Sequence, residues 1–478
     1  MAAIHTEDVA LFSIPPYNYA EDDISWDLLG PCYITSQKES CIQFQISGNA
    51  TQYVDLSRTE LYMKLRVKKK DGTDFTGDES GLPINNIFHT MWATCDIKLN
   101  KVCVSTSGNN YMYKAYIENL LNYNYNAQKY QLQSIGFAHD SRNFDARRFN
   151  ETPVNNGFRE RLKWFENKVK NPKPKPTPEN PDPTWTEFIT KKFQSCEFLG
   201  PLAADICNQG RIILNSVDID ITLKPTSDKF RIMSYPNGLE CYLEIEDVYL
   251  DVCKVDVADA VVIAHSNTLA KYNSKYPIQE SDIRTYEITQ GSTKFVIENV
   301  YNGVVPSRVI VGFVKSSAYC GDLTKNPLKF EPFNLHSICL FINGKQKPRR
   351  GYNFDIDNNV FLEGLMSLYK TTGKAWENTD IGIDRSTWPI GNALIAFDVD
   401  PTSSPDFIYL GKPKFGHTRM EICFKDPVKE AITLVLYAIF PARVEIDKPR
   451  NVTIIKQKEL LDEILRSKVH LPLAAPAA

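Results

Sequence analysis

The sequence lacks any long hydrophobic run and any cysteine pair at metal-binding spacing. Its apolar stretches fall short of the roughly 18 residues that span a bilayer, and the opening segment, 1–19, lacks the basic and apolar regions of a signal peptide. We therefore expect neither a membrane span nor secretion by a signal peptide. The eleven cysteines are scattered and never form CxxC, which predicts reduced, mostly buried thiols rather than a zinc site or disulfide framework.

An excess of charge of one sign is also missing. Lys and Arg number 55 against 58 Asp and Glu, for a net charge of −3, so a sequence-specific nucleic-acid binder is not expected. Two local basic clusters, Lys68–Lys70 and Lys347–Arg350, could touch nucleic acid or act as a nuclear signal. Both fall where a hairpin turn is expected, which favours charged loop tips.

Catalytic motifs are absent as well. The sequence contains no GxSxG, GxxxxGK[ST], GxGxxG or HExxH, and none of its seven histidines sits at ligand spacing from another. We therefore expect no enzyme, no cofactor and no metal. Three acidic pairs could in principle supply the two carboxylates of a glycosidase, but their alternation with apolar residues favours the solvated face of a strand. These pairs are Asp218/Asp220, Glu244/Glu246 and Asp398/Asp400.

Alternating apolar and polar residues recur along all 478 residues and predict a mainly β protein. In Leu61–Val67 the apolar side chains point one way and the basic ones the other, and Val217–Leu223 alternates in the same manner. The segment Ile432–Phe440 is apolar on both faces, as in a central strand covered on each side.

Two short helices with an apolar stripe are predicted, and each follows a strand that ends in asparagine. Similar strands then follow each helix, so the order of elements occurs twice. The first stripe comprises Tyr113, Tyr116, Ile117, Leu120 and Leu121. The second comprises Leu362, Leu365, Met366 and Tyr369.

The duplication divides the chain into two β units. We expect an N-terminal arm over 1–30, a first unit over 31–255, a connector over 256–281, a second unit over 282–452 and a C-terminal helix and tail over 453–478. The first unit carries a proline-rich surface insertion, 141–185, whose closely spaced prolines predict an extended, solvent-facing loop.

Two all-β units of this kind fit a double jelly roll, which is two antiparallel eight-stranded sandwiches with a few short helices in loops. Six stretches, in matching order, also resemble the major capsid protein of Maverick/Polinton elements and adintovirus-like DNA viruses. They are Leu11–Pro16, Tyr53–Ser57, Ser105–Tyr123, Ser307–Phe313, Lys325–Phe330 and Tyr437–Val452. That family is similar to the double jelly-roll capsid proteins of adenoviruses and virophages.

The resemblance implies a homotrimer whose six jelly rolls form a pseudo-hexagonal tile of an icosahedral shell around double-stranded DNA. The implied partners are the chain itself, neighbouring trimers, and penton and minor capsid proteins. The implied location is the virion, after synthesis in the host cytoplasm and with nuclear assembly as one option. A terminal helix with Leu460, Leu461, Ile464 and Leu465 is then a candidate to dock on the inner shell face, a minor capsid protein or an internal membrane.

Two other functions remain open from the sequence. A β-sandwich can bind or cleave carbohydrate, which requires an aromatic platform or a carboxylate pair in a cleft. A capsid-derived gene can also be kept by a host for another task, or encode a vertex or spike protein of the same virus type.

Overall fold

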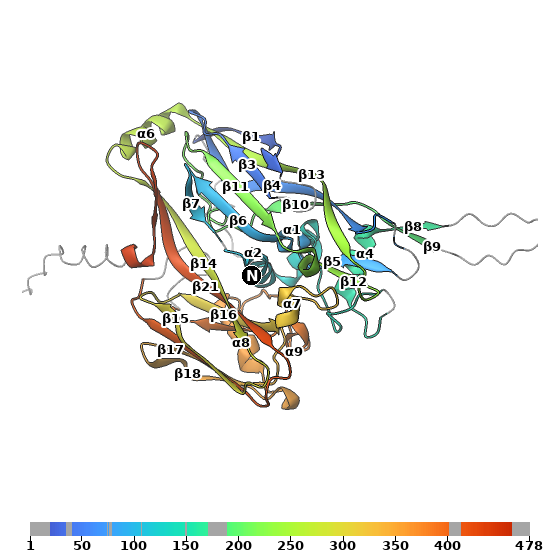
Figure 1. Cartoon of the computed structure of the whole chain (residues 1–478). Coiled ribbons are helices and arrows are strands. Elements are labelled where there is room, and N and C mark those ends of the chain that lie inside the picture. Colours follow the sequence, from blue (N-terminus) through green and yellow to red (C-terminus); the bar gives the residue numbers. More distant parts are fainter. Residues whose placement is uncertain are drawn as a thin grey trace, which may run out of the picture.

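The computed structural model describes residues 20–34, 41–73, 75, 79–106, 108–148, 151–170, 189–400 and 413–460. Figure 1 shows two β-sandwiches, one built from the first half of the chain and one from the second, with helix α2 between them. A single connected cluster of buried apolar side chains extends through both sandwiches.

The first sandwich consists of two antiparallel sheets. One sheet has the order β1 (Glu21–Leu29), β13 (Cys241–Val257), β4 (Gln52–Lys69) and β10 (Cys196–Pro201). The other has the order β2 (Tyr33–Ile34), β3 (Ile42–Ile46), β11 (Ile219–Pro225), β6 (Trp92–Leu99) and β7 (Val102–Ser105). A small pair, β5 (Ser80–Pro83) with β12 (Ile232–Tyr235), lies beside them.

The second sandwich repeats this plan. One sheet has the order β14 (Ser274–Ile288), β21 (Ile432–Ile446), β16 (Arg308–Lys315) and β19 (Leu394–Asp398), with β22 (Val452–Ile455) paired to β21. The other has the order β15 (Lys294–Asn302), β20 (His417–Phe424), β17 (Leu335–Ile342) and β18 (Lys345–Asn353).

The two sandwiches share one topology. We number the principal strands of each roll from one to eight along the chain, leaving out β2, β5, β8 (Glu166–Lys170), β9 (Ile189–Phe193), β12 and β22. In each roll, one sheet then has the order one, eight, three, six, and the other has the order two, seven, four, five. This is the strand order of a jelly roll. The prediction of a double jelly roll is therefore confirmed.

The duplication extends to the turns between the fourth and fifth strands. In each turn an asparagine and the residue after it have positive φ, as a tight hairpin turn requires. Asn100 donates its backbone N–H to the carbonyl of Asp218 and accepts the backbone N–H of Asp218 on Oδ1, at 2.9 and 2.8 Å. Asn343 makes the same pair of bonds with His417, at 3.0 and 2.9 Å. Each asparagine thus ties its hairpin to the seventh strand of its own roll.

Helices occupy the connections between strands. The longer ones are α2 (Tyr111–Asn122), α4 (Asn156–Phe165), α6 (Asp259–Leu269) and α8 (Leu362–Thr371). The shorter ones are α1 (Ile87–Thr90), α3 (Tyr125–Tyr130), η2 (Gln131–Ile135), α5 (Asp228–Arg231), α7 (Ser316–Cys320), η3 (Ile356–Asn358) and α9 (Trp388–Gly391). None of the helices in the described ranges is long and apolar enough to cross a bilayer.

The unit boundaries differ from those expected. The arm predicted over 1–30 contains β1, which pairs with β13 and completes the first roll. The second roll begins with β14 at Ser274, within the predicted connector 256–281, and α6 fills the remainder. Strand β1 has no clear apolar face because most of its residues are exposed. Strand β14 is mostly partly buried, and only four of its residues are fully buried, so its apolar pattern is weak.

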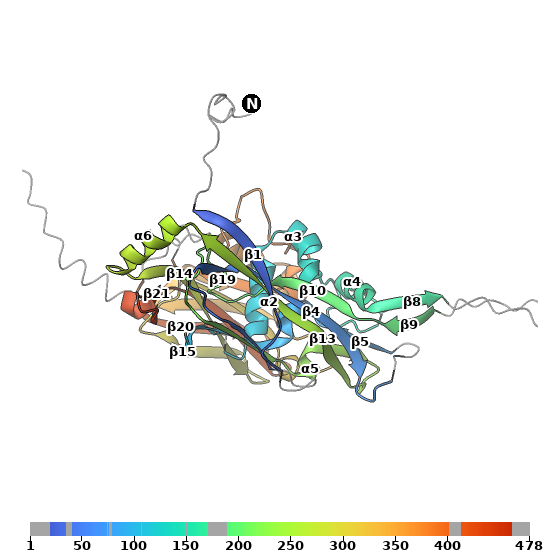
Figure 2. The same ribbon diagram turned by 90° about the horizontal axis from the view of Figure 1, so that it is seen from above.

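The insertion 141–185 also differs from the extended loop that its prolines predict. Its first part contains α4, which buries Phe158, Leu162 and Phe165 against the core at helical spacing. A hairpin of β8 (Glu166–Lys170) and β9 (Ile189–Phe193) follows and projects from the side of the molecule (Figures 1 and 2). The closely spaced prolines, between 172 and 183, lie outside the described residues.

Candidate functional site

Helix α2 lies in the junction between the two jelly rolls. All five side chains of its predicted stripe are buried, but so are those on its other faces, including Met112 and Lys114. Side chains from both rolls cover the helix. Tyr113 crosses the junction, because its hydroxyl donates to the carbonyl of Pro327 in the second roll at 3.0 Å.

A buried ionic cluster joins the two rolls through this helix. Lys114 Nζ lies 2.7 Å from Asp205 Oδ1 and 3.7 Å from Glu118 Oε1, all in the first roll. From the second roll, Ser281 donates its hydroxyl and its backbone N–H to Asp205, at 2.8 and 3.1 Å. Tyr437 donates its hydroxyl to Glu118 Oε1 at 2.8 Å. Both carboxylates of the first roll are thus held by β14 and β21 of the second.

The charges of this cluster depend on one another. Burial by itself lowers the pKa of Lys114, but Asp205 and Glu118 outweigh that effect and leave it raised, so the lysine stays charged. Burial raises the pKa of Glu118, against the opposing effect of Lys114. Only 2% of the Lys114 side chain is exposed, so no substrate reaches it. The cluster is a structural link between the rolls.

Helix α8 occupies the equivalent connection in the second roll, but its buried face differs from the predicted stripe. Leu365 is buried, Met366 and Tyr369 are partly buried, and Leu362 is 50% exposed. The core contact is completed by Leu368, which the stripe omitted. The expectation that Leu362 faces the core is therefore wrong, because this helix turns its Leu365–Leu368 side toward the sheets.

The C-terminal helix begins beside the second roll. Gln457 donates its side-chain amide to the carbonyl of Val305 at 2.8 Å, and Leu460 is buried. Leu461, Ile464 and Leu465 lie outside the described residues. Docking of this helix on another component stays a prediction.

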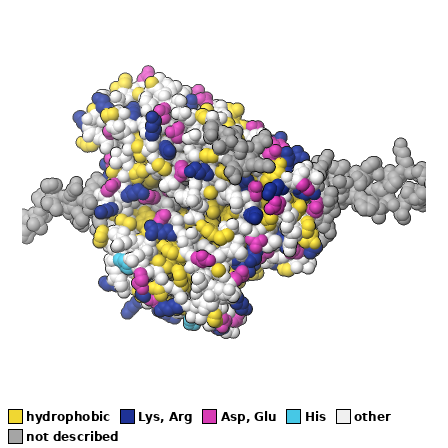
Figure 3. Space-filling model, in the orientation of Figure 1, with side chains coloured by type: hydrophobic (Ala, Val, Ile, Leu, Met, Phe, Trp, Pro, Cys, Tyr) yellow, Lys and Arg dark blue, Asp and Glu magenta, His cyan; other side chains and the backbone are white. Residues whose placement is uncertain are grey.

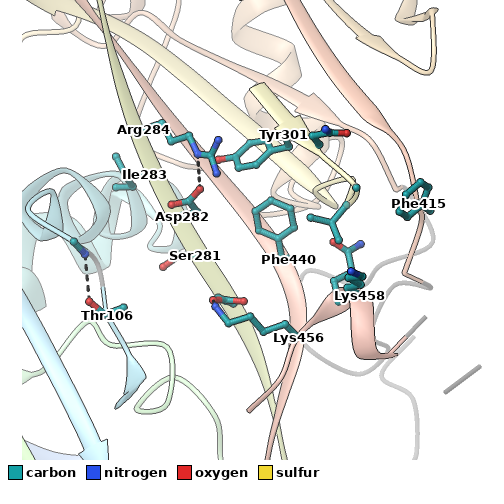
Figure 4. Close-up of a pocket in the computed structure, with 16 residues that line it drawn as sticks. Thr106, Ser281, Asp282, Ile283, Arg284, Tyr301, Phe415, Phe440, Lys456 and Lys458 are labelled. Carbon is teal, nitrogen blue, oxygen red and sulfur yellow. Dashed lines mark hydrogen bonds and ion pairs between the residues drawn. The ribbon is translucent and has the colours of Figure 1, made fainter. Parts of the chain in front are cut away.

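A cavity of about 810 Å³ lies between the first roll, strand β14 and the start of the C-terminal helix (Figure 4). The guanidinium of Arg284 lies over the Tyr301 ring at 4.1 Å and donates to Asp282 at 2.9 Å. Lys456 pairs with Glu280. Figure 3, in the orientation of Figure 1, shows hydrophobic side chains mixed with charged ones across the middle of the molecule.

These ion pairs do not suit the carboxylate chemistry of carbohydrate cleavage. A glycosidase needs one carboxylic acid that holds a proton, and a neighbouring cation favours the ionised form. Both carboxylates that line the cavity are bound by cations. Two of the three acidic pairs singled out in the sequence also meet cations, since Glu244 pairs with Lys68 and Asp400 with Lys414.

The two basic clusters have different surroundings. Lys68, Lys69 and Lys70 each pair with a glutamate, namely Glu244, Glu79 and Glu240. The second cluster, 347–350, does not occupy a loop tip as expected, because the turn falls earlier, at Asn343, and the cluster lies within β18. No group of three or more metal-ligating side chains occurs in the part of the chain that the structure describes.

His89 provides a test of how tightly the core around α2 is closed. It is buried, with Nδ1 3.0 Å from the hydroxyl of Tyr111, and burial, with a smaller effect of Lys114, lowers its pKa from 6.5 to about 3. Between these values the unfolded chain binds a proton that the folded chain does not. The contribution of His89 to the free energy of unfolding is therefore complete above pH 6.5. It decreases by about 1.4 kcal/mol per pH unit as the pH falls from 6.5 toward 3.

We expect His89→Gln to remove this contribution. The urea midpoint of the wild type should fall more steeply between pH 7 and pH 5 than that of the variant, each compared with its own value at pH 7. Parallel pH profiles for the two proteins would show that the imidazole is accessible to protons.

The fold defined by these two rolls is that of double jelly-roll capsid proteins. The protein matches a chain in the structure of the Sputnik virophage with a TM-score of 0.61 and 9% identity. The match covers 99% of this chain and 96% of the virophage chain. The mavirus major capsid protein matches with a TM-score of 0.51 and 10% identity, over 98% and 96% of the two chains. The Faustovirus major capsid protein matches with a TM-score of 0.54 and 8% identity, over 94% and 92%.

In sequence, the chain is 25% identical over 430 residues to the uncharacterized protein F54H12.2 of Caenorhabditis elegans, covering 87% of this chain and 93% of that protein. No family model matches the chain. The neighbours from mavirus and Faustovirus are both named as major capsid proteins.

Proposed function

We propose that this chain is a structural major capsid protein, whose homotrimers tile an icosahedral shell around double-stranded DNA. The observation that carries the proposal is the match to a virophage chain across 99% of this protein, both rolls included. The buried junction supports the same role, because a tile needs its two rolls held in one arrangement.

Three copies would place six jelly rolls around one axis. Each chain would meet two neighbours through heterologous contacts, and permanent assemblies of this type commonly bury more than about 2,000 Å² per interface. Contacts between trimers can then be weaker, because many of them act together while each remains reversible enough to correct errors. Penton and minor capsid proteins would complete the shell.

We further propose that the chain belongs to the Maverick/Polinton and adintovirus-like lineage. The six matching stretches of sequence support this assignment, and so does the relative in an animal, which is expected of elements that integrate into host genomes. Location in the virion, after synthesis in the host cytoplasm, follows from the same proposal.

Size-exclusion chromatography with light scattering, followed by electron microscopy, tests the capsid function. We expect a particle of three times the 54.4 kDa of one chain, with a pseudo-hexagonal outline. A monodisperse monomer, or a fivefold ring, would contradict the proposal.

A host-retained, capsid-derived protein is the second candidate, and the relative in Caenorhabditis elegans favours it. Such a protein would still form trimers. The two candidates differ in whether particles purified from the source cells contain nuclease-protected DNA.

The β8–β9 hairpin leads to a further prediction. It projects from the body of the first roll (Figure 2), so we expect replacement of residues 171–188 by Asn-Gly to leave the trimer mass unchanged. Asn-Gly suits a two-residue hairpin turn. Light scattering of the shortened chain checks this, and a monomer would place the hairpin in the trimer contact.

A further inference from the structure

Strand β18 presents a basic bulge at the open edge of its sheet. It is the last strand of its sheet, so one of its sides has no neighbouring strand within the described residues. In its register with β17, Tyr352 pairs with Ile338 and Lys347 pairs with Leu340. The four residues 348–351 of β18 therefore lie opposite a single residue of β17, Cys339. The extra residues bulge outward and display Arg349 and Arg350.

No described carboxylate forms an ion pair with the arginines of this bulge. Lys345, Arg349, Arg350 and the nearby Lys370 of α8 are exposed, and none forms an ion pair with a described residue. The other basic cluster of the chain, 68–70, is fully paired with glutamates. Unpaired cations gathered on one edge attract an acidic partner.

A hollow of about 530 Å³ lies beside the bulge, between β18 and α8. Its apolar lining includes Leu362, Met366 and Phe397, and Arg350 and Lys370 lie among its basic groups. The carboxylates of Glu363 and Asp398 line it as well. An apolar lining with both signs of charge suits a peptide better than the uniform charge of a nucleic-acid backbone.

The N-terminal segment, 1–19, has the complementary character. It carries Glu7 and Asp8 and no Lys or Arg, since the first basic residue after His5 is Lys38. Residues 9–14 are mostly apolar, and include Leu11 and Phe12. These 19 residues can span roughly 60 Å when extended.

We propose that residues 7–14 of a second copy bind along the β18 edge, with Glu7 and Asp8 on the arginines of the bulge and apolar side chains in the hollow. Addition of a strand to an open edge is an established mode of peptide recognition. A second copy is favoured because β1, which follows residues 1–19 in the chain, and β18 lie at opposite ends of the molecule (Figure 1). The inference rests on the proposed function, since binding of the N-terminal segment of one subunit to the next would link neighbouring subunits.

A charge-reversal cycle in the full chain tests the proposal. Arg349→Glu with Arg350→Glu, and separately Glu7→Lys with Asp8→Lys, should each weaken assembly of subunits at least about tenfold. The four substitutions together should restore it. Lys224→Glu with Lys429→Glu reverses two exposed lysines elsewhere and is the matched control. Circular dichroism verifies that each variant is folded.

A labelled peptide of residues 1–19 gives a second measurement that does not depend on assembly. It should bind the full chain at least about tenfold more tightly than it binds the Arg349→Glu, Arg350→Glu variant. Peptide binding by a monomeric chain would support the inference while contradicting the capsid function. Trimers without peptide binding or charge rescue would overturn the inference alone. Binding of duplex DNA, and not of the peptide, through these arginines would also overturn it.

Discussion

Replacing Lys114 with methionine is expected to lower the free energy of unfolding by about 3–5 kcal/mol, because the substitution leaves two buried carboxylates without a counter-charge. Those carboxylates, Asp205 and Glu118, are held in turn by Ser281 and Tyr437 of the second roll. Loss of the Lys114 charge should therefore destabilise both the first roll and its contact with the second roll. Urea unfolding at pH 7 and fixed protein concentration measures it.

The matched control is Lys64→Met. Lys64 lies 3.9 Å from Glu246 on the surface of the first roll, and its side chain is 39% exposed. A surface pair of this kind contributes less than about 1 kcal/mol. Equal midpoints for Lys114→Met and the wild type would show that the cluster does not stabilise the junction.

Replacing Leu120 with aspartate is expected to prevent formation of soluble trimers. Leu120 is 2% exposed within α2, and the substitution would bury an unpaired charge at a cost of more than about 4 kcal/mol. Soluble yield and light scattering measure the effect.

Leu120→Met is the control, because it keeps the volume and the apolar character and should cost less than about 1.5 kcal/mol. A soluble, trimeric Leu120→Asp protein would show that the junction around α2 opens to solvent.

The regular strands of the fold could be predicted from their alternation. Leu61–Val67 lies within β4, where buried and partly buried side chains alternate as the pattern indicates. The two asparagine turns could also be anticipated, since the residue type suits positive φ. Strand β1 could not, because an edge strand with most of its side chains in solvent has no apolar face to detect.

The site was harder to predict, because it depends on residues far apart in the sequence. Lys114 stands within an apolar helical pattern, and nothing local indicates that its partners are Asp205 in the first roll and, through it, Ser281 in the second. The basic run 347–350 was expected in a turn, because charge alone does not distinguish a loop tip from a bulge. Both features depend on the packing of the whole chain.

The link through α2 has a consequence for a curved shell. Since polar bonds and apolar packing fix one roll against the other, a subunit of this design has little freedom to flex between its halves. If such subunits enclose a genome, the change of angle from facet to facet must be taken up at the seams between capsomers.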